Sequence, residues 1–251
     1  MQTAALLPHL LTGVVAAYGL ALLLSFGRLH LARGVLTAGA LAHVVWMIWR
    51  GVAIGFVPMT NKTESFAAAA FSMAVVLLLT WSPSRAYVIP QLALCTAAGL
   101  AARVFPQELN EPGALLRTVW YPAHVPLSFL AIAAWVASAA AGLAWKISDD
   151  RAWLNRTDRL ALQGLGLWSA AMICGGLWGA FAWGAYFMWD PKMIWSVILW
   201  FHYAAFVHVR LTPSLQSRPW VRPALAWLGV AWILVAYVGT SFFFGKSSHA
   251  F

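Results

Sequence analysis

Charge is what this sequence lacks most. Only 9% of its 251 residues are charged, and just seven residues are acidic. Soluble globular domains are about one quarter charged, so these carboxylates are too few for the surface of a water-soluble body. A cytosolic enzyme, a disordered chain and a small secreted domain are therefore excluded. A membrane anchor with a soluble body is excluded too, because no charged, loop-rich stretch of the size of a small domain remains between the apolar runs.

Cysteine is equally scarce. Cys95 and Cys174 lie far apart within apolar runs, and neither belongs to a Cys-x-x-Cys pair. This spacing argues against a disulfide framework and a zinc site, and without Cys-x-x-Cys-His the chain is not itself a c-type cytochrome. Residues 1–11 contain no lysine or arginine, so we expect residues 10–26 to form a retained span rather than a cleaved signal peptide.

Apolar runs dominate what is present. The chain is 62% hydrophobic, with a mean hydropathy of +0.76, and about 20 apolar residues suffice to cross a bilayer as a helix. Charged residues and Pro/Gly clusters divide the runs into eight predicted helices, near 10–27, 35–57, 66–82, 86–104, 121–145, 161–181, 193–209 and 223–244. We therefore expect an all-α, polytopic membrane bundle that forms a single domain over residues 1–251.

The basic residues predict the direction of these spans. The net charge is +9, but the 16 Lys and Arg are scattered between apolar runs, as in membrane proteins, and they indicate no nucleic-acid partner. Ten lie on one side of the predicted spans: Arg28, Arg33, Arg85, Lys146, Arg151, Arg156, Arg159, Arg210, Arg218 and Arg222. The richer side should be cytoplasmic, which puts both termini, segments 105–123 and 178–195, and the C-terminal tail outside.

Tryptophan is concentrated in one of these outer segments. Five indoles fall between residues 178 and 200, at Trp178, Trp183, Trp189, Trp195 and Trp200. Gly179 and Gly184 interrupt them, and Asp190-Pro191-Lys192 follows. An aromatic belt at the membrane surface is one interpretation. A site for a planar aromatic ligand explains the pattern better, because glycines allow close approach and indole faces can form flat walls.

The same segment carries a family resemblance. The run WGAFAWGAYFMWDPKMIW over residues 178–195 resembles the WWD motif of haem-handling membrane proteins, and its core is similar to the CcsA (ResC) branch of cytochrome c biogenesis System II. Shorter similar stretches occur in the family's order: His43 to Arg50 with Pro58-Met-Thr-Asn61 and Glu64-Ser65, Trp120-Tyr-Pro-Ala-His124-Val, Phe206-Val-His208-Val-Arg210, and loosely Ser248-His249-Ala-Phe251. Met193, where the family usually has Glu, and Lys62, where it usually has an aromatic residue, depart from the pattern.

The resemblance implies roles for the histidines. His124 and His249 would be the axial ligands of a haem at the outer face. His208 would ligate the iron of a second haem inside the membrane, with a partner histidine from the companion protein CcsB (ResB). His43 is either an alternative ligand or a hydrogen-bonded packing residue, and we interpret His202 as a packing residue.

The remaining predicted haem contacts lie in the tryptophan-rich segment. They are Trp178, Trp183, Trp189, Trp195, Asp190 and Lys192. In this interpretation Lys192 pairs with a haem propionate and Asp190 orients a neighbouring donor. The alternative is a solvated loop whose lysine extends from the membrane edge.

The function implied by the resemblance is haem handling for cytochrome c maturation. Haem b, bound non-covalently in transit, would be exported and presented at the outer face of a bacterial cytoplasmic membrane or a thylakoid membrane. It would then be joined to an apocytochrome c that carries Cys-x-x-Cys-His, with thiol-reducing proteins as further partners. In the family this ligase activity belongs to the CcsA–CcsB complex, so the chain alone need not be an enzyme. Two alternatives stay open: a CcmC-like haem-delivery protein of System I, typically with six spans, and a b-type haem subunit or transporter without an assembly role.

Overall fold

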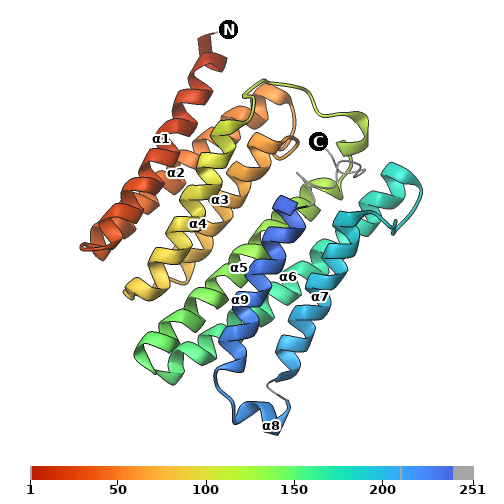
Figure 1. Ribbon diagram of the computed structural model, residues 1–251. Coiled ribbons are helices and arrows are strands. Elements are labelled where there is room, and N and C mark those ends of the chain that lie inside the picture. The colour runs from red at the N-terminus through yellow and green to blue at the C-terminus, as the bar shows by residue number, and fades with distance from the viewer. Residues whose placement is uncertain (1, 210, 240–251) are drawn as a thin grey trace. The chain divides into compact units, whose positions relative to one another are not determined.

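Every regular element in the described part of the chain is a helix. The computed structural model describes residues 2–209 and 211–239 (Figure 1). The elements are α1 (Gln2–Ser25), α2 (Leu29–Ile54), α3 (Lys62–Leu79), α4 (Arg85–Val104), η1 (Ala114–Leu116), α5 (Tyr121–Ser148), α6 (Arg151–Trp183), α7 (Pro191–Val209), α8 (Pro213–Gln216), α9 (Val221–Leu234) and η2 (Val235–Gly239). The all-α prediction is thereby confirmed.

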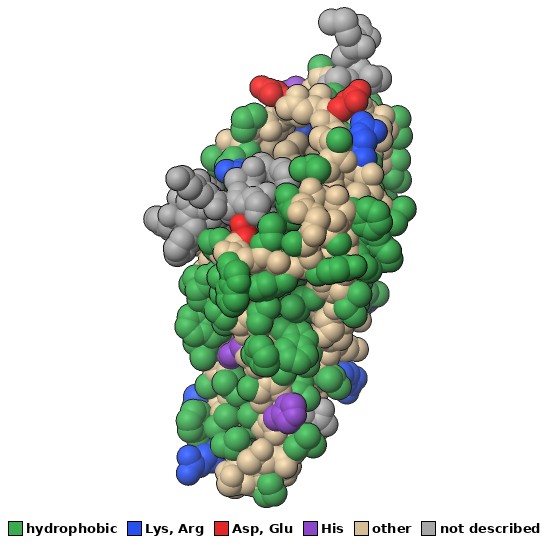
Figure 2. Space-filling model, turned by 90° about the vertical axis from the view of Figure 1, so that its right-hand side faces the viewer, with side chains coloured by type: hydrophobic (Ala, Val, Ile, Leu, Met, Phe, Trp, Pro, Cys, Tyr) green, Lys and Arg blue, Asp and Glu red, His purple; other side chains and the backbone are tan. Residues whose placement is uncertain are grey.

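Seven of these helices, α1 to α7, are long and apolar enough to cross a membrane, and α9 continues into η2 as a shorter apolar helix over Val221–Tyr237. The chain is thus an integral membrane protein. The shorter helix occupies the place of the eighth predicted span, whose last residues, 240–244, lie outside the described residues. Hydrophobic side chains cover much of the face drawn in Figure 2, as expected of helices that contact lipid.

One helix is much longer than predicted. We expected a span from residue 161, whereas α6 begins at Arg151. The charged residues before Leu160 interrupt the apolar run, but arginine has a high helix propensity. The carboxylate of Asp150 caps this end, because its Oδ1 accepts a hydrogen bond from the backbone N–H of Ala152 at 2.9 Å.

The chain divides into two compact units, Met1–Arg117 and Thr118–Phe251. The first contains α1 to α4 and η1, and the second contains α5 to α9 and η2. The single domain over residues 1–251 stays a prediction.

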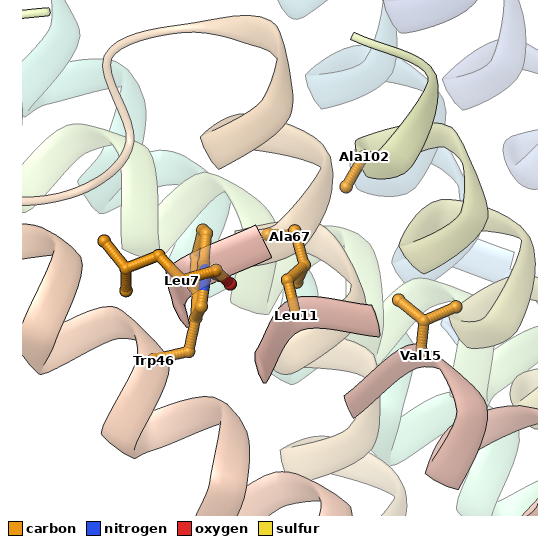
Figure 3. Close-up of a cluster of buried hydrophobic side chains, with 6 residues drawn as sticks. All are labelled: Leu7, Leu11, Val15, Trp46, Ala67 and Ala102. Atoms are coloured by element: carbon orange, nitrogen blue, oxygen red, sulfur yellow. Dashed lines mark hydrogen bonds between the residues drawn. The ribbon is translucent and has the colours of Figure 1, made fainter. Parts of the chain in front are cut away.

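The core of the first unit forms where α1 meets the other three long helices. Figure 3 shows its buried side chains: Leu7, Leu11, Val15, Trp46, Ala67 and Ala102. The indole of Trp46 on α2 also donates a hydrogen bond to the backbone oxygen of Leu7 on α1, at 3.1 Å. Small alanines on α3 and α4 let the helices approach closely, as in many membrane bundles.

A buried ion pair organises one end of the first unit. Arg50 on α2 and Glu64 on α3 are 1% and 0% exposed, and Nε of Arg50 lies 2.6 Å from Oε1 of Glu64. Arg50 also donates to the backbone oxygens of Gln107 and Glu108, while Oε2 of Glu64 accepts from the backbone and side chain of Thr60. The stretch between His43 and Glu64 that resembles the family is therefore, in part, a structural network that joins α2, α3 and the segment after α4.

In the second unit, α5 is the central helix. Residues 131–142 along it are all buried. The indole of Trp135 lies against Gly164 on α6, donates to the backbone oxygen of Ala161 at 3.2 Å, and stacks on Tyr203 of α7 with 3.8 Å between ring centroids. Trp135 therefore joins three helices of this unit.

This packing predicts that Gly164→Ala destabilises the protein. A Cβ at Gly164 would collide with Nε1 of Trp135, so the rigid indole or the helices must shift. Overpacking of this kind costs about 1–3 kcal/mol. At Gly166 on the same helix a Cβ would meet nothing within 4 Å, so Gly166→Ala is the matched control. Thermal unfolding in detergent should show a lower Tm for Gly164→Ala only, and equal midpoints would contradict the packing described.

Candidate functional site

His124, near the start of α5, is held by a backbone group of α6. Its Nδ1 lies 2.7 Å from the carbonyl oxygen of Ala171. A carbonyl oxygen only accepts hydrogen bonds, so Nδ1 carries the hydrogen, and Nε2 of the neutral ring keeps its lone pair. Histidines that ligate metals commonly donate their second ring N–H to a backbone carbonyl in this way. The second unit thus fixes the orientation of the His124 ring through Nδ1, while its predicted role as an iron ligand stays a proposal.

The imidazole of His124 fits between a glycine and an indole. At Gly175 on α6, a Cβ would lie 2.7 Å from Nδ1 of His124, so only glycine leaves room for the ring as it is placed. The ring of Trp178 lies nearly parallel to the imidazole, with 6.1 Å between centroids and 28° between planes. Trp178 also contacts Tyr121 and Trp183, at centroid distances of 5.0 and 4.9 Å. These residues form one aromatic cluster around His124.

Beyond this cluster the chain exposes several large aromatic side chains. Gly184 ends α6 with φ of +72°, a backbone conformation that favours glycine. The exposed rings before and after it are Phe181, Tyr186, Phe187 and Trp189, of which Trp189 is 86% exposed. The rings of Phe187 and Trp189 contact each other, with 5.5 Å between their centroids. The segment therefore offers flat apolar groups close in sequence to the His124 cluster.

Asp190 and Lys192 form the start of α7. Asp190 is buried, and its Oδ1 accepts a hydrogen bond from the backbone N–H of Lys192 at 2.9 Å. With Pro191 as the first helical residue, this arrangement is that of an N-cap. Next to it, the sulfur of Met193 accepts from the backbone N–H of Met188. The structure thus gives Asp190 a role in the fold, while its predicted role toward haem stays a proposal.

The other tryptophans of the segment pack elsewhere. Trp195 on α7 contacts Trp232 of α9, with 5.7 Å between ring centroids, and Trp200 donates a hydrogen bond to the hydroxyl of Ser169 on α6. Among the predicted tryptophans, the structure places Trp178 and Trp183 in the His124 cluster. It places Trp189 in the exposed segment and Trp195 between helices.

His208 lies in the last turn of α7. Its side chain is exposed, and its Nδ1 lies 2.7 Å from the carbonyl oxygen of Ala204, one turn earlier. Nδ1 therefore donates, and Nε2 keeps its lone pair, as in His124. By contrast, Nε2 of His202 bonds to the carbonyl oxygen of Leu225 on α9 at 2.9 Å, which is the packing role predicted for it.

His43 occupies the interior of the first unit. It is fully buried, and its Nδ1 shares a 3.0 Å hydrogen bond with the hydroxyl of Tyr18. The rings of Trp46 and Phe71 pack on it at centroid distances of 5.6 and 5.3 Å. Nε2 of His43 is buried without a hydrogen-bond partner among the described residues. The packed rings support the packing alternative, and ligation through Nε2 stays a prediction.

Two further observations bear on the predicted iron ligands. His249 lies outside the described residues. Within the described residues no cluster of three or more His, Cys, Asp or Glu could hold a bare metal ion. Haem brings its own four nitrogen donors and needs only axial ligands. His124, with aromatic rings beside it, could supply one such axial ligand.

The sequence did not indicate the partners of His124 on α6. Ala171 contributes only a backbone oxygen, and Gly175 contributes only the absence of a side chain. The signal that could have found them is the spacing of Ala171, Gly175 and Gly179, small residues four apart that often line helix contacts in membranes.

Comparisons with known proteins agree with this fold and motif. A family model described as "Cytochrome C assembly protein" matches residues 37–245. "Cytochrome c biogenesis protein CcsA" of Gloeobacter violaceus (strain ATCC 29082 / PCC 7421) is 41% identical over 108 residues, which cover 42% of this chain and 31% of that protein. The CcsA of Synechococcus sp. (strain JA-2-3B'a(2-13)) is 41% identical over 98 residues, 39% of this chain and 27% of that protein.

Other relatives match over more of their length. The CcsA of Prochlorococcus marinus (strain MIT 9301) is 27% identical over 239 residues, 78% of this chain and 76% of that protein. A solved structure, "Cytochrome c Heme Lyase CcmF", superposes with a TM-score of 0.75 at 19% identity, over 94% of this chain and 46% of that one. This likeness supports the fold. The resemblance to CcsA inferred from the motifs is confirmed, and the chain belongs to the cytochrome c assembly protein family.

Proposed function

We propose that this chain binds haem b and presents it at the outer face of its membrane for covalent attachment to apocytochrome c. Its family gives it a role in cytochrome c biogenesis. The observation that carries the proposal of haem binding is the hydrogen bond of His124. Its Nδ1 donates to the Ala171 carbonyl, so the lone pair of Nε2, beside the Trp178 ring, can bind iron. Neutral imidazole is a common axial ligand of haem iron.

The neighbouring groups suit the rest of the haem. Trp178 is only 2% exposed, so it supports His124 from within the unit, whereas the half-buried Trp183 and the exposed rings around Gly184 offer faces to a flat apolar macrocycle. Lys192, at the start of α7, is the proposed partner of a propionate. We retain His249 as the second axial ligand on the strength of the resemblance. Haem is the cargo here, so this site must hold it firmly and yet release it.

The proposed reaction on this cargo is thioether formation. A cysteine S–H of the apocytochrome adds across a haem vinyl group: the S–H bond and the vinyl π bond break, and one C–S and one C–H bond form. No net oxidation takes place, but both thiols of Cys-x-x-Cys-His must be reduced beforehand, which requires thiol-reducing proteins. The chain would act in a complex with a CcsB-like membrane protein, in a bacterial cytoplasmic or thylakoid membrane.

The orientation of the second unit is part of the proposal. The His124 end of α5, the Trp183 end of α6 and the start of α7 lie at one end of this unit's antiparallel helices. Lys146, Arg151 and Arg222 lie where the same helices turn at the other end. We assign the basic end to the cytoplasm, which faces the His124 cluster outward and puts both termini outside.

His208 is the proposed ligand of a second haem, near the inner end of α7. Its exposed ring, with Nε2 available, supports this role, because a second ligand from a CcsB-like protein needs access to the same iron. From Asp190 to His208 a helix rises about 27 Å. One haem cannot span that length, so the two histidines would serve separate sites.

This assignment predicts that His208→Ala lowers the haem content at the outer site and reduces cytochrome c maturation severalfold. Added imidazole should restore less cytochrome c maturation here than at an open site. The reason is that the inner site also requires the partner ligand from the CcsB-like protein to be already aligned with the iron. His202→Ala, on the same helix, is the control for loss of a packing histidine. The measurement is haem per protein by pyridine haemochrome together with matured cytochrome c. Full haem and full maturation in His208→Ala would remove the inner site from the proposal.

The test of the whole proposal is reconstitution. The chain is expressed with an apocytochrome c carrying Cys-x-x-Cys-His, with and without a CcsB-like partner, in cells that lack their own maturation proteins. We expect haem covalently bound to the cytochrome only when both membrane proteins are present, detected by haem staining after denaturing electrophoresis. Haem in the membrane fraction without maturation would instead favour a b-type haem subunit. Transfer of non-covalent haem to another carrier, with no need for the partner, would favour a CcmC-like protein.

A further inference from the structure

A polar cavity lies at the basic end of the second unit, away from the His124 cluster. Its volume is about 380 Å³, within the usual range of ligand-binding sites. The lining residues come from the start of α6, from α8 and its following turn, and from the start of α9: Arg151, Leu154, Asn155, Gln216, Ser217, Pro219 and Arg222. The proposed haem function uses none of them.

The cavity is built to attract an anion. Arg151 is exposed and forms no ion pair with another described residue. Nη1 of Arg222 lies 2.9 Å from Oδ2 of Asp158, which fixes the guanidinium, while Nε of Arg222 is buried without a hydrogen-bond partner among the described residues. The amide of Asn155 adds a neutral donor at the wall, while the hydroxyl of Ser217 donates to the backbone oxygen of Ser214. Arginine is suited to phosphate because its planar fork can donate two parallel hydrogen bonds.

Backbone dipoles add to this charge. Arg151 is the first residue of α6, and Arg222 lies in the first turn of α9, so the positive ends of two helices meet at the cavity. The nearest carboxylate along α6, Asp150, bonds to the backbone N–H of Ala152. None of the described lining residues is acidic, and the carboxylate of Asp158 is paired with Arg222.

The position of the cavity indicates which anion reaches it. Arg222 directly precedes the apolar residues of α9, so it lies where that helix enters the membrane. Trp220 beside it is 57% exposed. The half-buried Trp153 on α6 lies with its ring centroid 5.1 Å from Cζ of Arg156. Exposed tryptophans are typical of the headgroup level. The geometry points to a site for the phosphate of an anionic membrane phospholipid, with its acyl chains beside the apolar part of α9.

The experiment compares lipids and two matched variants. The full chain is purified in a non-ionic detergent, and its adducts with phosphatidylglycerol and with phosphatidylcholine are counted by native mass spectrometry. Arg151→Gln removes a cavity cation. Arg159→Gln removes an exposed cation of the same helix that is not in the lining. Both residues are exposed, so neither change should unfold the protein, and circular dichroism checks this.

We expect phosphatidylglycerol to be retained in preference to phosphatidylcholine. Arg151→Gln should weaken this retention about fivefold, the usual effect of one basic residue at a lipid surface, and Arg159→Gln should leave it unchanged. An excess of inorganic phosphate should fail to displace the lipid. Equal retention of the two lipids, or equal loss in the two variants, would overturn the site. Complete displacement by inorganic phosphate would overturn its assignment to a lipid.

Discussion

His124→Ala is expected to lower the haem retained by the purified protein, and the cytochrome c that it matures, by at least about tenfold. Loss of a group that merely orients a metal ligand costs about 10–100-fold in affinity, and this substitution removes the proposed ligand itself. The cavity that it leaves is bounded by Gly175 and the ring of Trp178. Added imidazole can occupy that space, so part of the lost maturation should return. Haem per protein and matured cytochrome are the measurements.

A pair of neighbouring glycines provides the control for this result. Gly175→Ala keeps the imidazole but places a Cβ 2.7 Å from its Nδ1, whereas a Cβ at Gly176 would meet only the backbone oxygen of Tyr186 at 3.5 Å, an ordinary contact. Gly175→Ala should therefore displace His124 and change the haem absorbance spectrum, and Gly176→Ala should not. If His124→Ala keeps full activity without imidazole, or if both glycine variants behave alike, His124 is not the ligand.

Arg50→Met is expected to cost about 3–5 kcal/mol of stability, because it leaves the buried carboxylate of Glu64 without its partner. It also removes the donors to the backbone oxygens of Gln107 and Glu108. The exposed pair between Arg117 and Glu111, with side chains 46% and 83% exposed at 3.2 Å, lies in the same unit. Exposed ion pairs of this kind contribute at most about 1 kcal/mol.

The comparison is made by thermal unfolding in detergent, with Arg117→Met as the matched control. Arg50→Met should lower the Tm markedly, and Arg117→Met should barely change it. Similar midpoints for the two variants would show that the Arg50–Glu64 network does not hold the first unit together, and the motif residues around it would then need a different explanation.

The sequence predicted the helices well, because apolar length alone decides which segments can cross a bilayer. The start of α6 was predicted wrongly, because a charged side chain can end an apolar run and still favour a helix. Arg151 and Arg156 interrupt an apolar run but continue a helix, so α6 begins well before the apolar residues do. The last residues of the eighth predicted span, 240–244, lie outside the described residues, so its full length stays a prediction.

For the site, the sequence identified side chains with distinctive chemistry but not their neighbours. His124 and Trp178 follow from their residue types and motif. The contribution of Ala171 is a backbone oxygen, and it depends on how α5 packs along α6. Proximity in sequence also suggested one tryptophan pocket. Helical geometry separates its members, because Trp195 and Trp200 on α7 point toward α9 and α6.

The most direct test of the central claim is the haem content of the wild-type chain purified from haem-replete cells. Absorbance of the oxidised and reduced protein, with a pyridine haemochrome assay, identifies the haem type and its ligation. We expect non-covalent haem b with the low-spin spectrum of two histidine ligands. Helical, well-folded protein from such cells that contains no haem would contradict the proposal that this chain binds and presents haem.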